Sequence, residues 1–185
     1  MSTILLLLVL GAAAWAVLSY NGLVTLRNRV QNGWKQIDVQ LKRRHDLIPN
    51  LIETVKGAMQ FERDTLERVV AARAKAVSAT TVAETAETER QLTQSLGRLL
   101  AVIENYPELK SNQNVLQLQE ELTTTENQLT FARQFYNDTV MQFNSRQEVF
   151  PSNLLANFFG FQRAEFFSAD DADRTISHVD LTLKS

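Results

Sequence analysis

A seven-residue repeat of apolar side chains constrains the fold of this chain more than any other feature. Between residues 115 and 150 every seventh position is apolar or aromatic, and a row of smaller residues accompanies it three positions later. Such spacing places both rows on one stripe of a helix, as in packed coiled-coil helices. The rows are Val115, Leu122, Leu129, Tyr136, Phe143 and Phe150, with Leu118, Thr125, Ala132 and Thr139. They predict one helix of about 36 residues, which Pro151 ends.

A similar pair of rows covers the first half of the chain. It consists of Trp34, Leu41, Ile48, Val55 and Val69, with Val30, Ile37, Leu51 and Ala58. Asp46 followed by Pro49 is typical of a helix start, with Asp46 as N-cap and Pro49 in the first turn. The repeat nevertheless continues through Pro49. The pattern leaves two arrangements open, a hairpin at 42–45 or one long helix kinked at Pro49.

Two more helices are predicted from turn signals. A polar stretch at 78–81 precedes a helix of about 20 residues that begins near Ala83 and stops at Pro107. After Pro151, a short helix starting at Ser152 is expected to close at Gly160, where glycine adopts the left-handed conformation easily.

Composition favours a single, mainly helical domain without catalytic chemistry. The 185 residues include only six glycines and three prolines, too few for many turns or Gly-rich ligand loops. No cysteine and two histidines exclude most metal and triad sites, and a net charge of −2 argues against a broadly basic nucleic-acid-binding surface. The motifs G-x-S-x-G, G-x-G-x-x-G, P-loop and E-x-x-H are absent. We expect no enzyme activity, no cofactor, no metal and no nucleic-acid partner.

The amino end has the length and composition of a membrane anchor. From residue 4 to residue 20 the chain carries no charged side chain. Seventeen helical residues reach about 25 Å, at the short end of what crosses a bilayer core of about 30 Å. We predict an anchor over residues 1–20, with Ile4 and Leu8 in lipid and Trp15 and Tyr20 near the interface.

A cleaved signal peptide is the alternative, because the small residues at 12–16 resemble a processing site. The first three residues contain no basic side chain, and the amphipathic pattern continues past the apolar stretch, so an uncleaved anchor is favoured. Basic residues follow the stretch, starting with Arg27 and Arg29, and none precedes it. This predicts a single-pass inner (plasma) membrane protein with its amino end outside and the bulk of the chain in the cytoplasm.

Two further groups of residues are candidates for interaction. Lys42, Arg43 and Arg44, followed by Asp46, either contact anionic headgroups, or form a solvated turn or an intramolecular pair with Asp46. On a straight helix Lys42 lies about 33 Å beyond the interface, so Arg27 is better placed for lipid.

The second group is a Phe-rich end, since six of the ten phenylalanines lie between residues 150 and 167. These rings either fold back to cap the open end of the bundle or, at Phe158, Phe159 and Phe161, form an exposed patch that docks a partner or lipid. After residue 167 a polar tail is expected.

Three long strings resemble the LemA family. They are IDVQLKRRHDLIPNLIETVKG at 37–57, ENYPELKSNQNVLQLQEELTTTEN at 104–127 and ARQFYNDTVMQFN at 132–144, with YNGLVTLRN and FFGF nearby. The resemblance covers residues 20–167, and residues 168–185 match nothing in it. It implies a bacterial, all-α protein with an amino-terminal transmembrane helix and an antiparallel, coiled-coil-like four-helix bundle over residues 21–167.

The resemblance also implies a non-enzymatic scaffold or adaptor, sometimes associated with membrane-bound zinc peptidases or other membrane proteins, and a magnetosome relative is linked to membrane shaping. We expect this chain to self-assemble or to organise other membrane proteins through its heptad faces. The alternatives are a membrane-remodelling or anionic-lipid-binding protein, and a ligand-sensing helical bundle. Stripes of this spacing suit an internal core and an oligomer seam equally.

Overall fold

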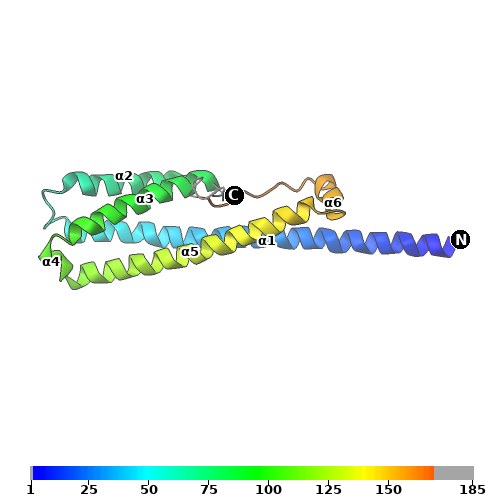
Figure 1. The fold of residues 1–185 in the computed structure, drawn as a ribbon, viewed down its shortest axis with the longest axis horizontal. Helices are drawn as coiled ribbons and strands as arrows, with labels where there is room; N and C mark the ends of the chain where they lie inside the picture. Colours follow the sequence, from blue (N-terminus) through cyan, green and yellow to red (C-terminus); the bar gives the residue numbers. More distant parts are fainter. Residues whose placement is uncertain (1, 169–185) are drawn as a thin grey trace, which may run out of the picture.

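The computed structural model describes residues 2–168, and all the regular secondary structure in this part of the chain is helical. Its helices are α1 (Ser2–Val55), α2 (Arg63–Ser78), α3 (Val82–Ile103), α4 (Pro107–Lys110), α5 (Gln113–Glu148) and α6 (Ser152–Phe158). Figure 1 shows an elongated molecule in which α5 lies along α1, while α2 and α3 cover only the half farther from the amino end. The predicted tail lies outside the described residues from residue 169 on.

Helix α1 runs without a break through Pro49. Proline has no N–H, so the carbonyl oxygen of His45, four residues earlier, loses its helical donor. Arg73 of α2 donates to this oxygen through Nε at 2.7 Å. The hairpin at 42–45 is therefore excluded, and Asp46 is not an N-cap. The guanidinium of α2 replaces the missing backbone bond and ties α2 to α1.

Helix α1 ends at Val55, although the heptad rows predicted a continuation as far as Val69. The row containing Val55 needs an apolar residue at position 62, but Glu62 stands there and is half-buried at the start of α2. The helix that the heptad rows extend to Val69 is therefore interrupted, because that gap in the row marks a turn.

The remaining helix boundaries agree with the turn signals. Helix α3 begins after Thr81, whose side chain accepts a hydrogen bond from the Glu84 N–H at 3.1 Å. Helix α5 has the predicted 36 residues and is capped by the side chain of Asn112. Gly160, just past α6, has φ of 67°, the left-handed value expected of it.

The buried side chains form two cores along the molecule, which we call the distal core and the proximal core. The distal core joins the end of α1 to α2, α3 and the start of α5; it contains Leu47, Ile48, Leu51, Val55, Met59, Leu66, Val69, Ala72, Ala76, Leu92, Leu96, Leu99, Ile103, Leu109, Val115 and Leu122. The proximal core joins the earlier part of α1 to the later part of α5; it contains Leu23, Val30, Ile37, Leu41, Ala86, Leu129, Ala132, Tyr136, Val140, Phe143, Ala156 and Phe167. Most of the heptad rows are thus internal, whereas Phe150 is exposed.

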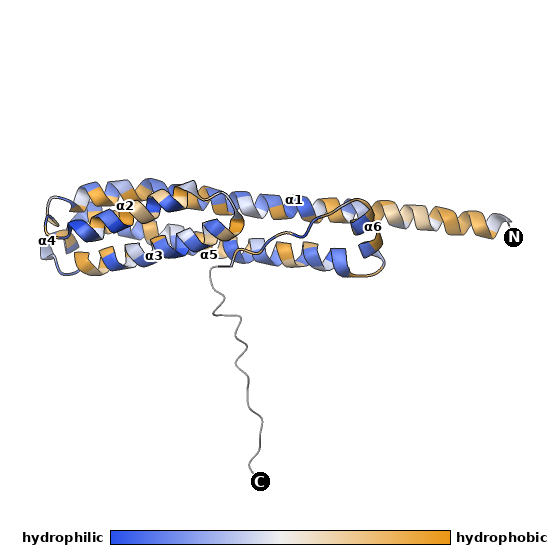
Figure 2. Cartoon of the chain, turned by 90° about the horizontal axis from the view of Figure 1, so that it is seen from above, coloured by the Kyte–Doolittle hydropathy of each residue, from blue (hydrophilic) through white to orange (hydrophobic). Residues whose placement is uncertain are grey.

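After α6 the chain returns along α1 and α5 as an extended segment, residues 160–168, which we call the strap (Figure 2). Two asparagines of α5 hold it. The amide of Asn144 accepts from the N–H of Ala164 and donates to its carbonyl oxygen, both at 2.9 Å. Asn137 does the same with Phe167 at 2.9 and 3.0 Å. Seven helical residues and three extended residues each span about 10 Å, so the two spacings match.

Candidate functional site

The apolar start of α1 lies outside both cores. Every described residue before Ala16 is exposed, and the first buried residue of α1 is Ser19. Among the described helices only α1 is long and apolar enough to cross a membrane. Figure 2 shows this hydrophobic stretch, which includes Ile4 and Leu8, extending alone beyond the rest of the fold.

Aromatic and basic side chains meet where α1 enters the proximal core. The ring of Tyr20 lies 4.7 Å from that of Phe159 and 5.9 Å from that of Phe161, measured between centroids. Arg27 places its guanidinium carbon 5.5 Å from the centre of the Phe161 ring, within the range of a cation–π contact. Trp15, one turn before this junction, is exposed, as are Arg27 and Arg29.

In the Phe-rich end, some rings fold back onto the bundle and others form an exposed patch, so each of the two predicted arrangements applies to part of it. Phe167 is buried in the proximal core, and its ring lies 6.1 Å from that of Trp34; Phe161 is half-buried beside the same core. Phe158 is 82% exposed and Phe159 is also exposed. Part of this end therefore folds back through the strap, and the part on α6 faces outward.

The basic cluster at 42–44 is not a turn. All three residues lie inside α1, where Lys42, Arg43 and Asp46 are exposed. Arg44 is 3% exposed and is held by Glu89 and Glu126 rather than by Asp46. The interpretation of Arg44 as a surface or turn determinant was wrong.

Arg44 belongs to a buried charge cluster made with His45, Glu89, Glu126 and Arg133. Its Nη1 lies 3.2 Å from Glu89 Oε2 and 3.0 Å from Glu126 Oε2. The other carboxylate oxygen of Glu89 is 2.6 Å from His45 Nε2. Glu126 Oε1 is 3.9 Å from Arg133 Nη1. The charge cluster thus links α1, α3 and α5 between the distal and the proximal core.

The charges of this cluster are largely removed from water, so they need partners of opposite charge. Glu89 is fully buried, so its charge is stabilised by its partners instead of by water. Burial lowers the pKa of the Arg133 guanidinium, an effect that the Glu126 carboxylate opposes. An arginine titrates so far above neutrality that it keeps its charge even so. The groups of the cluster bind one another, an arrangement that fixes helix positions.

The sequence contains a signal for this charge cluster, namely charged residues at positions where the apolar rows are interrupted. Position 44 is the missing member of the companion row, midway between Ile37 and Leu51. Glu89 interrupts the stripe of α3 in the same way, three residues before Leu92. Opposite charges on two otherwise apolar stripes predict a buried pair, because neither charge is tolerated alone.

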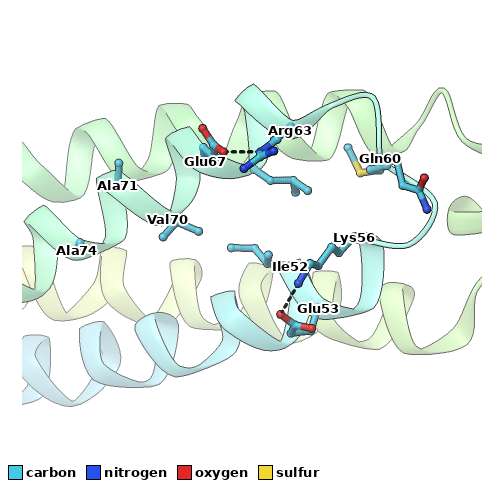
Figure 3. Close-up of a pocket in the computed structure, with 11 residues that line it drawn as sticks. Ile52, Glu53, Lys56, Gln60, Arg63, Glu67, Val70, Ala71 and Ala74 are labelled. Atoms are coloured by element: carbon cyan, nitrogen blue, oxygen red, sulfur yellow. Dashed lines mark hydrogen bonds and ion pairs between the residues drawn. The ribbon is translucent and has the colours of Figure 1, made fainter.

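Two apolar grooves are open on the surface. The tip groove, of about 660 Å³, lies between the end of α1 and α2 and contains Ile52, Met59 and Val70 (Figure 3). Ion pairs of Lys56 with Glu53 and of Arg63 with Glu67 stand beside it, at 3.6 and 2.8 Å. The adjoining turn carries Phe61, which is 96% exposed.

The lateral groove, of about 560 Å³, lies between α1 and α5 beside the proximal core; it is lined by Lys35, Gln36, Val39, Gln40, Gln128, Phe131, Ala132 and Phe135. Phe131 is 70% exposed, and Val39 and Phe135 are also exposed. The side-chain oxygen of Gln40 is buried without a hydrogen-bond partner. Such a buried acceptor is costly unless a donor reaches it.

Within residues 2–168, no group of three or more histidine and carboxylate side chains is placed to hold a metal ion.

Comparison with known proteins gives a consistent assignment. The model of the LemA family matches residues 33–181, so the match extends past residue 167, where the resemblance described above stopped. Protein LemA of Metamycoplasma hominis is 28% identical over 156 residues, which cover 83% of this chain and 71% of that protein. Magnetosome protein MamQ 2 of Paramagnetospirillum magneticum is 24% identical, covering 88% and 69% respectively. MamQ of Magnetospirillum gryphiswaldense is 22% identical, covering 86% and 68%.

Proposed function

Because the chain belongs to the LemA family, we propose that it is a non-enzymatic, membrane-anchored helical scaffold that assembles with itself or organises other membrane proteins. The observation that carries the proposal is the lateral groove, an exposed apolar surface along the α1 and α5 pair. The most buried charged groups engage one another in the charge cluster, which suits a structural role for them.

In this proposal residues 21–167 form an antiparallel four-helix bundle. The two cores support it, since the last part of α1 packs with the start of α5, and the middle part of α1, from Leu23 to Leu41, packs with the later part of α5. Helices α2 and α3 pack on each other and complete the distal half.

Residues 1–20 are the anchor of this scaffold, with the amino end outside the inner membrane and the bundle in the cytoplasm. The exposed apolar start of α1 supports the anchor. The proposed orientation is supported by Arg27 and Arg29, the first charged side chains after the apolar stretch.

A second copy of the chain is the occupant that best fits the lateral groove. A symmetric dimer would bring Phe131 and Phe135 of each copy against the other and remove exposed rings from water.

The mass of the full-length protein, extracted in native nanodiscs without crosslinker, tests this proposal. We expect a regular homo-oligomer, which the double variant Phe131→Ser/Phe135→Ser converts to monomers. Met141→Ser is the matched control, since it also removes an exposed apolar side chain of α5 but lies outside the lateral groove. A monomeric wild-type protein without a co-purifying membrane protein would refute the scaffold.

Direct binding to anionic lipid is a second candidate, favoured by the exposed Arg27 and Arg29 beside the apolar stretch. Each basic side chain near an anionic surface contributes about 1 kcal/mol, and salt screens the attraction. Residues 21–185 should then bind anionic vesicles, and binding should fall with salt and with Arg27→Gln/Arg29→Gln, but not with the exposed control pair Arg68→Gln/Arg98→Gln. Binding that is indifferent to lipid charge would exclude this candidate.

A further inference from the structure

Helix α6 and its entry carry an outward apolar stripe that neither core covers. Phe150, Leu154 and Phe158 are spaced by four residues, and all are exposed. Ser152 and Ala156, on the opposite side of α6, are each 2% exposed. A helix with a packed side and an apolar outer side lacks a partner for the outer one.

The position of this stripe along α1 is fixed by ring contacts. Phe159, the residue after α6, packs on Tyr20, the last residue of the predicted anchor, and Phe158 lies 5.1 Å from Phe159 between ring centres. Ser19 is the first buried residue of α1. The covered part of α1 therefore begins at the residue where the candidate membrane segment ends, and α6 lies at that boundary (Figure 1).

We propose that α6 lies in the interface of the same bilayer that α1 crosses, with Phe150, Leu154 and Phe158 inserted among the lipid chains. This inference rests on the anchoring of α1 proposed above. The stripe continues the exposed apolar surface of α1 at the depth where Trp15 and Tyr20 meet the headgroups, a depth that aromatic rings favour. That continuity identifies the occupant as the bilayer surface rather than a separate protein.

The protein presents this helix already folded. Seven residues are too few for a stable isolated helix. Here the Ser152 hydroxyl bonds to the carbonyl oxygens of Arg146 and Val149 at 2.7 and 2.8 Å, and Gly160 closes the other end. Insertion therefore requires no folding of α6 at the membrane, unlike most interfacial helices.

Attachment of the bundle to the bilayer through both α1 and α6 would restrict its orientation more than attachment through α1 alone. A single transmembrane helix leaves the bundle free to rotate about it, whereas α6 at a second point fixes which side of the bundle faces the membrane. Because the contact is apolar, high salt should leave it intact, which separates it from headgroup binding by Arg27 and Arg29.

Single labelling sites test the inference, since the natural chain has no cysteine. Full-length Phe158→Cys, carrying an environment-sensitive fluorophore, is placed in phosphatidylcholine nanodiscs and exposed to a membrane-impermeant aqueous quencher. Val17→Cys reports on the anchor, and Phe61→Cys, the most exposed phenylalanine on the distant turn, is the water-facing control. Leu154→Cys repeats the measurement on α6, and circular dichroism checks that each variant is folded.

We expect Phe158→Cys and Leu154→Cys to be protected severalfold relative to Phe61→Cys, in low and in high salt. Protection at position 17 with quenching at 154 and 158 equal to that at 61 would overturn the inference and leave the anchor standing. Full quenching at position 17 would overturn the anchor and the inference together. Protection of α6 that disappears in high salt would also overturn it, because the contact would then be electrostatic.

Discussion

Arg44 and Glu89 occupy positions where the surrounding stripes supply only apolar side chains. Each is compensated by the other, and Thr93, His45 and Glu126 take up part of the remaining hydrogen-bonding capacity. A buried pair of this kind contributes little net stability compared with apolar residues, but leaving one member alone is costly. Its effect is therefore on helix register, because a shifted α3 would leave both charges unpaired.

We predict that Arg44→Met lowers the free energy of unfolding by about 3 kcal/mol or more, because Glu89 keeps a buried charge without its guanidinium. Arg44→Met/Glu89→Met should recover most of the loss. Urea unfolding followed by circular dichroism measures both. Arg43→Met, on the exposed side of the same turn, should stay within about 0.5 kcal/mol of wild type. A double variant as unstable as Arg44→Met would contradict the pairing.

At the residue scale, the sequence predicted the buried apolar side chains well. It did not predict which charged side chains are buried. The heptad rows identified Ile37, Leu51 and Leu129 as core residues because periodicity reports on a face of a helix. It does not report which helix lies opposite. The partners of Arg44 come from two other helices, at positions 89 and 126, so only the three-dimensional arrangement reveals them.

Among the elements, α1 is unusual because it contains an internal proline whose cost is offset by a side chain from another helix. The Arg73 Nε bond to the His45 carbonyl oxygen replaces the bond that the Pro49 nitrogen cannot make. The continuity of α1 and the docking of α2 are thus coupled.

We predict that Arg73→Met destabilises the wild-type protein by about 1–3 kcal/mol, because a carbonyl oxygen loses its donor. In the Pro49→Ala background the same change should cost less, since the restored backbone N–H at position 49 supplies a donor. A double-mutant cycle measured by urea unfolding gives the coupling energy. A coupling energy of zero would show that the two groups do not serve the same oxygen.

The strap is held by two side-chain amides of α5. Each pairs with a backbone N–H and a backbone carbonyl oxygen of the strap, as a neighbouring strand would. Asn137→Ala and Asn144→Ala should each weaken the packing of the strap on α5. Asn137→Ala should accelerate hydrogen exchange at the Phe167 N–H, and Asn144→Ala at the Ala164 N–H, because these N–H groups donate to the two side-chain amides. Native-state hydrogen exchange measures the effect. The control is Gln142→Ala, which removes a side-chain amide from the exposed side of α5 and should leave both N–H groups protected.

Turn signals predicted most element boundaries, since proline, glycine and polar caps act locally. The stop before Pro107, the end of α5 before Pro151 and the φ of Gly160 agree with them. The turn after Val55 and the path of the strap were not predicted. The turn after Val55 is marked only by Gly57, a single glycine that a helical pattern can tolerate, and the strap depends on amides of α5 reaching a segment that has no periodicity of its own.

In the whole molecule, the distal and proximal cores share α1 and α5, so neither core is an independent unit. We predict that Leu99→Ala in the distal core and Leu129→Ala in the proximal core each cost about 2–5 kcal/mol, because both side chains are fully buried.

In each variant the unfolding midpoint followed by circular dichroism should equal the midpoint followed by Trp34 fluorescence, since a cooperative molecule unfolds in one transition. Trp34 contacts the proximal core, and a Trp15→Phe background makes it the sole tryptophan. If Leu99→Ala moved the transition seen by circular dichroism and left that of Trp34 unchanged, the cores would be separate folding units.

With α1 anchored as proposed, its uninterrupted length sets a clearance between the bilayer and the tip groove. From Tyr20 to Val55 the helix rises about 50 Å, and with α1 upright the tip groove stands at that height. In that arrangement a membrane protein with only short loops on the same side could not reach the tip groove, however well its surface matches. Under the proposed anchoring, proteins that extend far from the membrane could contact the tip groove, and proteins that extend only a short way could contact only the exposed side of the α1 and α5 pair.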